Sequence, residues 1–161
     1  MVKNGYNGVT SGKKWREIMF FIGTYYHNLD EKSRFILPSK LREKLGGTIY
    51  VTLGLDKCLT IYPEETYMKL ATDLGKASFM QTDNRNYKRT FFGNSYELTL
   101  DKQGRVTLDR NLCSKVGILK EIVVVGVEDH VEVWDKAKYE AMEEANDASY
   151  EDNASRVHYG D

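Results

Sequence analysis

Two short motifs in this chain of 161 residues pair an aspartate with an arginine four positions later. They are Asp30…Arg34 and Asp101…Arg105. The planar guanidinium of arginine holds five N–H donors in a fixed fork, which matches phosphate oxygens and the O6/N7 edge of guanine. The aspartate can cap a turn and orient that fork, or it can form a simple exposed ion pair, which contributes little to stability. The spacing of one such motif is weak evidence for DNA binding. Because the motif occurs twice, we weigh DNA contact and a simple ion pair as equally good interpretations.

Basic and polar side chains surround both motifs. Lys32 lies inside the first motif, and Lys102 and Gln103 lie inside the second. The other basic residues near the motifs and in the linker between them are Lys40, Arg42, Lys44, Arg85, Lys88, Arg89, Arg110 and Lys115. Side chains that bind phosphates displace counterions, so DNA binding through these residues would be sensitive to salt.

The formal net charge of −1 at first argues against a polyanionic partner. Residues 1–134, however, hold 20 Lys and Arg against 16 Asp and Glu, a net charge of +4. Residues 135–161 hold 3 against 8, a net charge of −5. The total is therefore a mildly basic body offset by an acidic tail. This pattern suits nucleic acid binding, or a tail that only aids solubility.

The chain contains an internal repeat. Residues 25–46 and 96–117 share eight identities at a constant offset of 71 positions. The identical pairs are Tyr25/Tyr96, Leu29/Leu100, Asp30/Asp101, Arg34/Arg105, Leu37/Leu108, Leu41/Leu112, Lys44/Lys115 and Gly46/Gly117. The chain is thus two copies of a unit of about 50 residues. A unit of this size buries too little surface to be very stable as an isolated domain. Two copies can share one core, and edge strands left over would favour oligomers.

Each copy is predicted to fold in the order ββαββα. A first hairpin, at 25–37 in copy one, carries the motif in its turn, so both motifs lie at hairpin tips. A short helix follows, between Pro38 and Gly46 in copy one and between Asp109 and Gly117 in copy two. The remaining strands are expected at 49–53, 58–62, 121–125 and 130–134, and the closing helices at 63–74 and 135–145, with residues 75–94 as a linker.

Several segments resemble the MraZ family of bacterial transcriptional regulators. They are YHNLDEKSRFILPSKLRE, LDKQGRVTLDRNL, the turn that begins at Gly54 and the Phe91-Phe92-Gly93 linker. The resemblance covers Met19 to about residue 147. It implies an α+β, β-rich fold of two tandem AbrB-like swapped-hairpin units that form a double-split β-barrel. It also implies a ring of identical subunits that binds short direct repeats in double-stranded DNA upstream of its own operon, the division and cell-wall gene cluster, mainly as a repressor.

The resemblance also assigns roles to individual residues. Arg34 and Arg105 would contact DNA, while Asp30 and Asp101 would shape the turns. Members of the family usually have glycine just before the motif arginine. Gly104 fits this pattern, but Ser33 does not. The first turn is therefore expected to differ slightly in shape from the second.

Other kinds of site find little support. The three histidines are scattered, and no His, Cys or acidic cluster has metal-ligand spacing, so we expect no metal and no cofactor. Cys58 and Cys113 are expected to be small buried hydrophobic residues. No nucleotide-binding or hydrolase motif is present, so no catalytic residue, enzyme activity or small-molecule substrate is predicted.

No apolar run approaches the ~20 residues of a membrane span, and a cytoplasmic, nucleoid-associated protein is expected.

The domain organisation follows from the repeat. We expect an N-terminal extension at 1–18, with Met19 as the biological start, a DNA-binding unit at 24–66 and a second unit at 95–138. A helix and linker at 67–94 and an acidic tail at 139–161 complete the chain. Two alternatives to a repressor remain: a ring-forming scaffold that holds a protein partner, and an antitoxin-like module whose tail binds a toxin.

Overall fold

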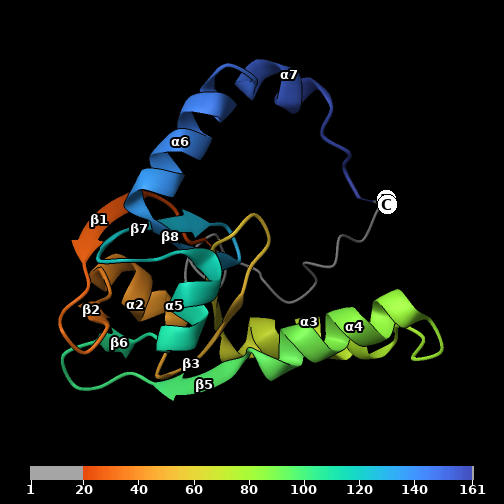
Figure 1. Cartoon of the computed structure of the whole chain (residues 1–161), viewed down its shortest axis with the longest axis horizontal. Helices are drawn as coiled ribbons and strands as arrows, with labels where there is room; N and C mark the ends of the chain where they lie inside the picture. The colour runs from red at the N-terminus through yellow and green to blue at the C-terminus, as the bar shows by residue number, and fades with distance from the viewer. Residues whose placement is uncertain (1–19, 161) are drawn as a thin grey trace, which may run out of the picture.

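The computed structural model describes residues 20–160. The predicted extension and the expected start at Met19 lie outside the described residues. The described part forms eight strands and six helices, which confirms the order ββαββα for each copy. The elements are β1 (Thr24–Asn28), β2 (Arg34–Ile36), α2 (Ser39–Leu45), β3 (Thr48–Leu53), β4 (Leu59–Pro63), α3 (Glu64–Gly75), α4 (Thr82–Gly93), β5 (Tyr96–Thr99), β6 (Arg105–Thr107), α5 (Arg110–Val116), β7 (Glu121–Val127), β8 (His130–Asp135), α6 (Lys136–Asp147) and α7 (Tyr150–Ser155) (Figure 1).

The strands form two separate antiparallel sheets. The larger has six strands in the order β1-β7-β8-β4-β3-β5, and the smaller contains only β2 and β6. The β3–β4 and β7–β8 pairs join strands within one copy, and β4–β8 joins the two copies at the centre of the large sheet. Over residues 20–160 neither sheet closes on itself, and β1 and β5 are the edges of the large one.

The predicted pairing of the first hairpin of each copy is wrong. Strand β1 of copy one pairs with β7 of copy two, and β5 of copy two pairs with β3 of copy one. The second strands of the two expected hairpins, β2 and β6, pair with each other. This exchange lets strands of one copy bury their apolar faces against the other copy, which a local hairpin in so small a unit cannot do. The chain between β1 and β2 still turns tightly, because Asp30 N–H donates to the Arg34 carbonyl at 2.9 Å.

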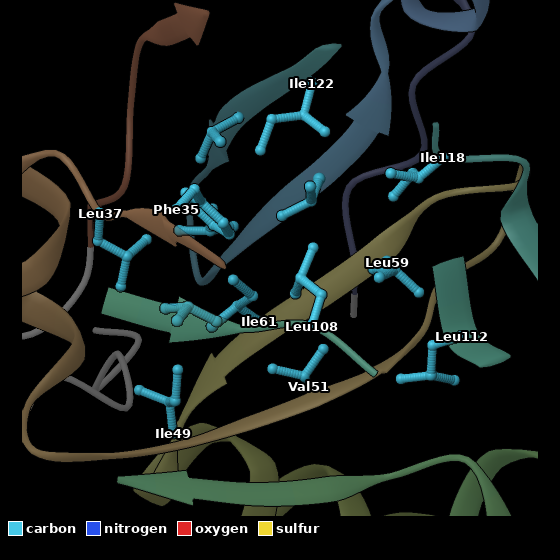
Figure 2. Close-up of a cluster of buried hydrophobic side chains, with 14 of the residues drawn as sticks. Phe35, Leu37, Ile49, Val51, Leu59, Ile61, Leu108, Leu112, Ile118 and Ile122 are labelled. Carbon is cyan, nitrogen blue, oxygen red and sulfur yellow. The ribbon is translucent and has the colours of Figure 1, made fainter. Parts of the chain in front are cut away.

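One hydrophobic core is shared by both copies. Phe35 of β2 and Val106 of β6 point into it, and leucines of α2 and α5 cover it from the side. Figure 2 shows Phe35, Ile49, Ile61 and Ile122, which belong to different strands of the two sheets, converging on this core. The small sheet is therefore held in place by burial of one of its faces.

Two helical segments extend from this body (Figure 1). The α3–α4 pair, which we call the arm, is anchored where Tyr67 stacks on Tyr50 with ring centroids 4.1 Å apart. Helix α4 occupies most of the region predicted as a linker. Its Phe91 is buried and stacks on Tyr67, so it packs rather than meeting a base. Helix α6 packs through Tyr139 against Trp134, and the exposed helix α7 follows it. Among the described residues, no helix has both the length and the apolar character needed to cross a membrane.

Candidate nucleic-acid interface

The first motif forms a turn over residues 30–34 that is organised by the carboxylate of Asp30. Its Oδ1 accepts hydrogen bonds from the backbone N–H groups of Lys32 at 2.8 Å and Arg34 at 2.9 Å. Its Oδ2 accepts one from Nε of the Arg34 side chain, also at 2.8 Å. The same carboxylate therefore holds both the backbone of the turn and the orientation of the guanidinium group.

The second motif repeats this geometry over residues 101–105. Oδ1 of Asp101 accepts hydrogen bonds from the N–H groups of Gln103 and Arg105, both at 2.9 Å, and Oδ2 accepts from Nε of Arg105 at 2.6 Å. Because the aspartate takes Nε, the two terminal NH₂ groups are the remaining side-chain donors of each arginine. No other hydrogen bond joins Arg34 or Arg105 side chains to residues 20–160.

The two turns share their backbone shape despite the Ser33-for-Gly departure. Ser33 and Gly104 both have a positive φ, of 58° and 74°. Each N–H donates to the carbonyl of its motif aspartate at 3.0 Å. The expected difference in shape is thus confined to one added backbone bond in the first turn, from Asp30 to Arg34. Serine tolerates here a conformation that favours glycine, at some cost in backbone strain.

Strands β2 and β6 bring the two arginines together on one two-stranded ribbon, which we call the β2–β6 ribbon. Arg34 lies opposite Thr107, and Ile36 lies opposite Arg105. Opposite residues share a face and successive residues alternate, so both arginines point away from the core that holds Phe35. From standard strand spacing their Cα atoms are about 8 Å apart. Both arginines line one open cavity of about 610 Å³, so the two arginines face the same space although their turns lie at opposite ends of the ribbon.

The charges of the motifs are favourable for keeping the aspartates ionised. Partial burial raises the pKa of Asp30, but hydrogen bonds from the Arg34 N–H and guanidinium outweigh it, and the pKa lies below its ordinary value. The corresponding bonds from Arg105 lower the pKa of Asp101. The side chains of Arg34 and Arg105 are 27% and 33% exposed. Each arginine is therefore partly accessible to solvent, while its Nε is held by the aspartate.

The remaining basic residues divide into two groups. Lys32, Lys102 and the Gln103 side chain lie exposed in the turns. Several others instead donate to backbone carbonyls, a role that their charge did not reveal. These donors are Arg42, Lys44, Arg85, Lys88 and Arg110. Arg85 and Lys88 hold the loop between α3 and α4, so their presence in the sequence is not evidence of a basic surface there.

The structure adds a polar cluster that spacing did not single out. His130 Nδ1 lies 2.8 Å from Asp129, and its Nε2 lies 3.2 Å from Glu132, which also accepts from Trp134 Nε1 at 3.0 Å. Burial lowers the pKa of His130, but the hydrogen bonds to Glu132 and Asp129 outweigh it, and the pKa is raised. The alternation of acids around His130 was a signal for this cluster, although nothing links it to the β2–β6 ribbon.

The two cysteines and the possible metal ligands are the other candidates for chemistry among the described residues. Cys58 and Cys113 are free and buried, as predicted. Burial raises the pKa of the Cys58 thiol to about 12 and also raises that of Cys113, so both thiols stay protonated. Within residues 20–160, no group of three or more His, Cys, Asp or Glu side chains is placed to hold a metal ion.

Comparison with known proteins identifies the family. The protein-family model described as "MraZ protein, putative antitoxin-like" matches the chain twice, over residues 20–90 and 91–158. The chain belongs to the MraZ family. Each matched segment contains one motif turn, so the family repeat coincides with the duplicated geometry. The boundary between the matches falls within α4.

Similar proteins in this family carry the name Transcriptional regulator MraZ. The one from Clostridium tetani is 42% identical over 137 residues, which is 85% of this chain and 96% of that protein. The one from Finegoldia magna is 37% identical over 134 residues, covering 83% and 94%. The one from Desulforamulus reducens is 39% identical over 137 residues. These relatives are named as transcriptional regulators.

Proposed function

We propose that this MraZ family member is a sequence-specific DNA-binding transcriptional regulator that reads base edges with Arg34 and Arg105. The observation that carries the proposal is their arrangement: two oriented guanidinium forks, about 8 Å apart at Cα, on the solvent face of one ribbon. The major groove of DNA admits a two-stranded β-ribbon, and arginine binds guanine O6 and N7 in a bidentate manner. With a rise of about 3.4 Å per base pair, such a pair can contact bases about two base pairs apart.

Residues around the forks take supporting roles in this proposal. Asp30 and Asp101 orient the arginines, Gly104 allows the positive φ of the second turn, and Gln103 offers a side-chain amide to a base or phosphate. Lys32 and Lys102 are exposed at opposite ends of the ribbon, where they would bind the flanking phosphates. Specificity then comes from the arginines, and salt-dependent affinity comes from the lysines.

We further infer repression of the division and cell-wall gene cluster, including the protein's own operon, through short direct repeats upstream of its promoter. One ribbon per subunit makes few base contacts, so a ring of subunits would gain affinity by binding several repeats at once. The exchanged strands and the two open edges, β1 and β5, suit the AbrB-like swapped-hairpin class and assembly with further copies. The double-split barrel, the units at 24–66 and 95–138, and a cytoplasmic, nucleoid-associated location remain predictions of the same proposal.

The test compares the wild type with an Arg34→Ala/Arg105→Ala variant. The probe is the DNA immediately upstream of the protein's own gene, and a duplex of the same composition in scrambled order is the competitor. Each lost bidentate contact is expected to cost about 1–3 kcal/mol, so the double variant loses its preference for the upstream DNA. Circular dichroism and size-exclusion chromatography are expected to be unchanged.

A matched control removes the same charge elsewhere. Lys69 and Arg89 are exposed on the arm, away from the ribbon, and a Lys69→Ala/Arg89→Ala variant should keep its preference for the upstream DNA. Normal retardation of the upstream fragment by the Arg34→Ala/Arg105→Ala variant would overturn the proposal.

The exposed tail favours one second candidate, an antitoxin-like or scaffold role. Tyr150, Val157 and Tyr159 are apolar side chains 75%, 53% and 88% exposed on an acidic segment, which could hold a protein partner. Removal of residues 147–161 separates the two functions. A DNA-binding regulator should still bind the DNA upstream of its gene after the deletion. A scaffold or antitoxin should no longer bind its protein partner.

A further inference from the structure

Two more arginines connect the copies, and neither belongs to the repeated motif. Arg42 of α2 donates from Nη1 to the carbonyl of Gln103, in the second turn, at 2.9 Å. Arg110 of α5 donates from Nη2 to the carbonyl of Glu31, in the first turn, at 3.2 Å. Each helix therefore fastens the turn of the other copy. Figure 1 shows α2, α5, β2 and β6 gathered at one end of the molecule.

These contacts complete the support of the β2–β6 ribbon. Three residue pairs join β2 to β6, and two further backbone bonds extend the ladder: Leu37 N–H to the Gly104 carbonyl at 3.0 Å, and Leu108 N–H to the Ser33 carbonyl at 2.9 Å. This ladder fixes the base of each turn. The carbonyls of Glu31 and Gln103 lie nearer the exposed ends, where the arginines add a tether from outside the ribbon.

The second turn leaves room for the Arg42 side chain at Gly104. A Cβ atom added at Gly104 would overlap the guanidinium of Arg42. A side chain at position 104 would therefore displace the Arg42 guanidinium from its hydrogen bond, and it would also have to adopt a positive φ. In the first turn Ser33 carries a Cβ at the corresponding position. There Arg110 binds the carbonyl two residues before the serine, whereas Arg42 binds the carbonyl directly before the glycine.

We propose that Arg42 and Arg110 are positioning residues. They hold the two turns in a fixed arrangement and thereby set how strongly the protein discriminates between DNA sequences. This inference rests on the proposed function. Arg34 and Arg105 are held by aspartates inside their own turns, so their direction is only as well defined as the turns themselves. A turn tethered to the opposite helix keeps its fork at a fixed angle to the other fork. Only sequences that match that spacing then bind well, because pre-organisation penalises poor fits.

The competing role for Arg42 and Arg110 is direct binding of DNA phosphates. The two roles predict different measurements. Loss of a phosphate contact weakens binding to every sequence alike and lowers the slope of log K against log salt by about one per contact. Loss of a positioning contact leaves that slope almost unchanged and lowers the ratio of affinities for matched and unmatched DNA.

The experiment uses an Arg42→Gln/Arg110→Gln variant of the full chain. Its control is Lys40→Gln/Lys115→Gln, which removes the same charge from exposed positions on the same two helices. The probes are the DNA upstream of the protein's own gene and its scrambled duplex. We expect the ratio of the two affinities to fall about tenfold or more in the arginine variant and by less than about twofold in the lysine control. A uniform loss of affinity for both duplexes, with a reduced salt slope, would overturn the proposal.

A second readout needs no DNA. Amide ¹⁵N order parameters of the turns, Glu31–Ser33 and Lys102–Gly104, should fall from about 0.85 toward 0.6 in the arginine variant and stay unchanged in the control. Unchanged turns in the arginine variant would overturn the proposal even if DNA binding were lost. A wild type that fails to distinguish the two duplexes would instead count against the proposed function. Should the double variant unfold, Arg42→Gln and Arg110→Gln taken singly should each loosen only the turn of the other copy.

Discussion

Arg34 and Arg105 lie on the same face of one two-stranded ribbon, although 71 positions separate them in the chain. Neither strand of that ribbon pairs with the strand that precedes it. Each copy supplies one strand and one turn, so the surface exists only when both copies are folded together. Any mutation that separates the copies should therefore abolish the side-by-side arrangement of the two arginines.

The fork of Arg105, rather than its charge alone, is expected to read DNA. Arg105→Lys keeps the positive charge but replaces a planar bidentate donor with a single ammonium group. We expect discrimination between the upstream and scrambled duplexes to fall about fivefold or more, because one bidentate contact provides about 1–3 kcal/mol. The slope of affinity against salt should stay the same. Lys102→Arg is the control, and equal discrimination by Arg105→Lys and the wild type would contradict a bidentate contact.

The glycine and the serine before the motif arginines should respond differently to exchange. Gly104→Ser places a Cβ against the Arg42 guanidinium at a positive φ, and we expect a loss of about 2 kcal/mol in the free energy of unfolding from strain and the displaced hydrogen bond. Ser33→Gly removes strain at the matching position and should stay within about 1 kcal/mol of the wild type. Urea unfolding at matched protein concentration measures both. Similar losses for the two variants would refute the asymmetry.

Acid should weaken the turns through Asp30 and Asp101. The pKa values of both aspartates lie below their ordinary value, because each carboxylate accepts hydrogen bonds from its arginine. Their contribution to stability is present above the ordinary pKa and is lost as pH falls through the lowered folded-state pKa. An Asp30→Asn/Asp101→Asn variant should be less stable than the wild type at pH 7, and the difference should narrow near pH 2.5. Asp147→Asn/Asp152→Asn is the control in urea unfolding, and a difference independent of pH would argue against this linkage.

His130 should act in the opposite direction. Its pKa is raised because Asp129 and Glu132 favour the imidazolium against the effect of burial. The resulting stabilisation is complete below the unfolded-state pKa of about 6.5 and is lost as pH rises through the raised folded-state pKa. His130→Gln should therefore destabilise the protein most near pH 5.5 and least near pH 9. The exposed His158 supplies the control substitution, His158→Gln. A wild-type advantage that grows with pH would show the assignment to be wrong.

Local sequence determined the elements and the turns of this protein. The repeat at 25–46 and 96–117, the cap at Asp109 and the stop at Gly117 predicted helices and strands close to their observed positions, because capping and apolar periodicity act over a few residues. The carboxylate–guanidinium geometry of each motif also lies within five consecutive residues. These features needed no knowledge of the partners across the sheet.

The pairing of the strands, and the choice of which basic residues stay free, depend on contacts between the copies. The exchange of β1, β2, β5 and β6 between copies depends on burial of faces far apart in the chain, a term that local propensity does not contain. Arg42 and Arg110 occupy different positions in the repeat, so duplication could not reveal that each binds the opposite turn. Interactions within each five-residue motif specify a turn that orients an arginine. Only the shared core placed them on one ribbon, because hydrophobic burial was available only between the copies.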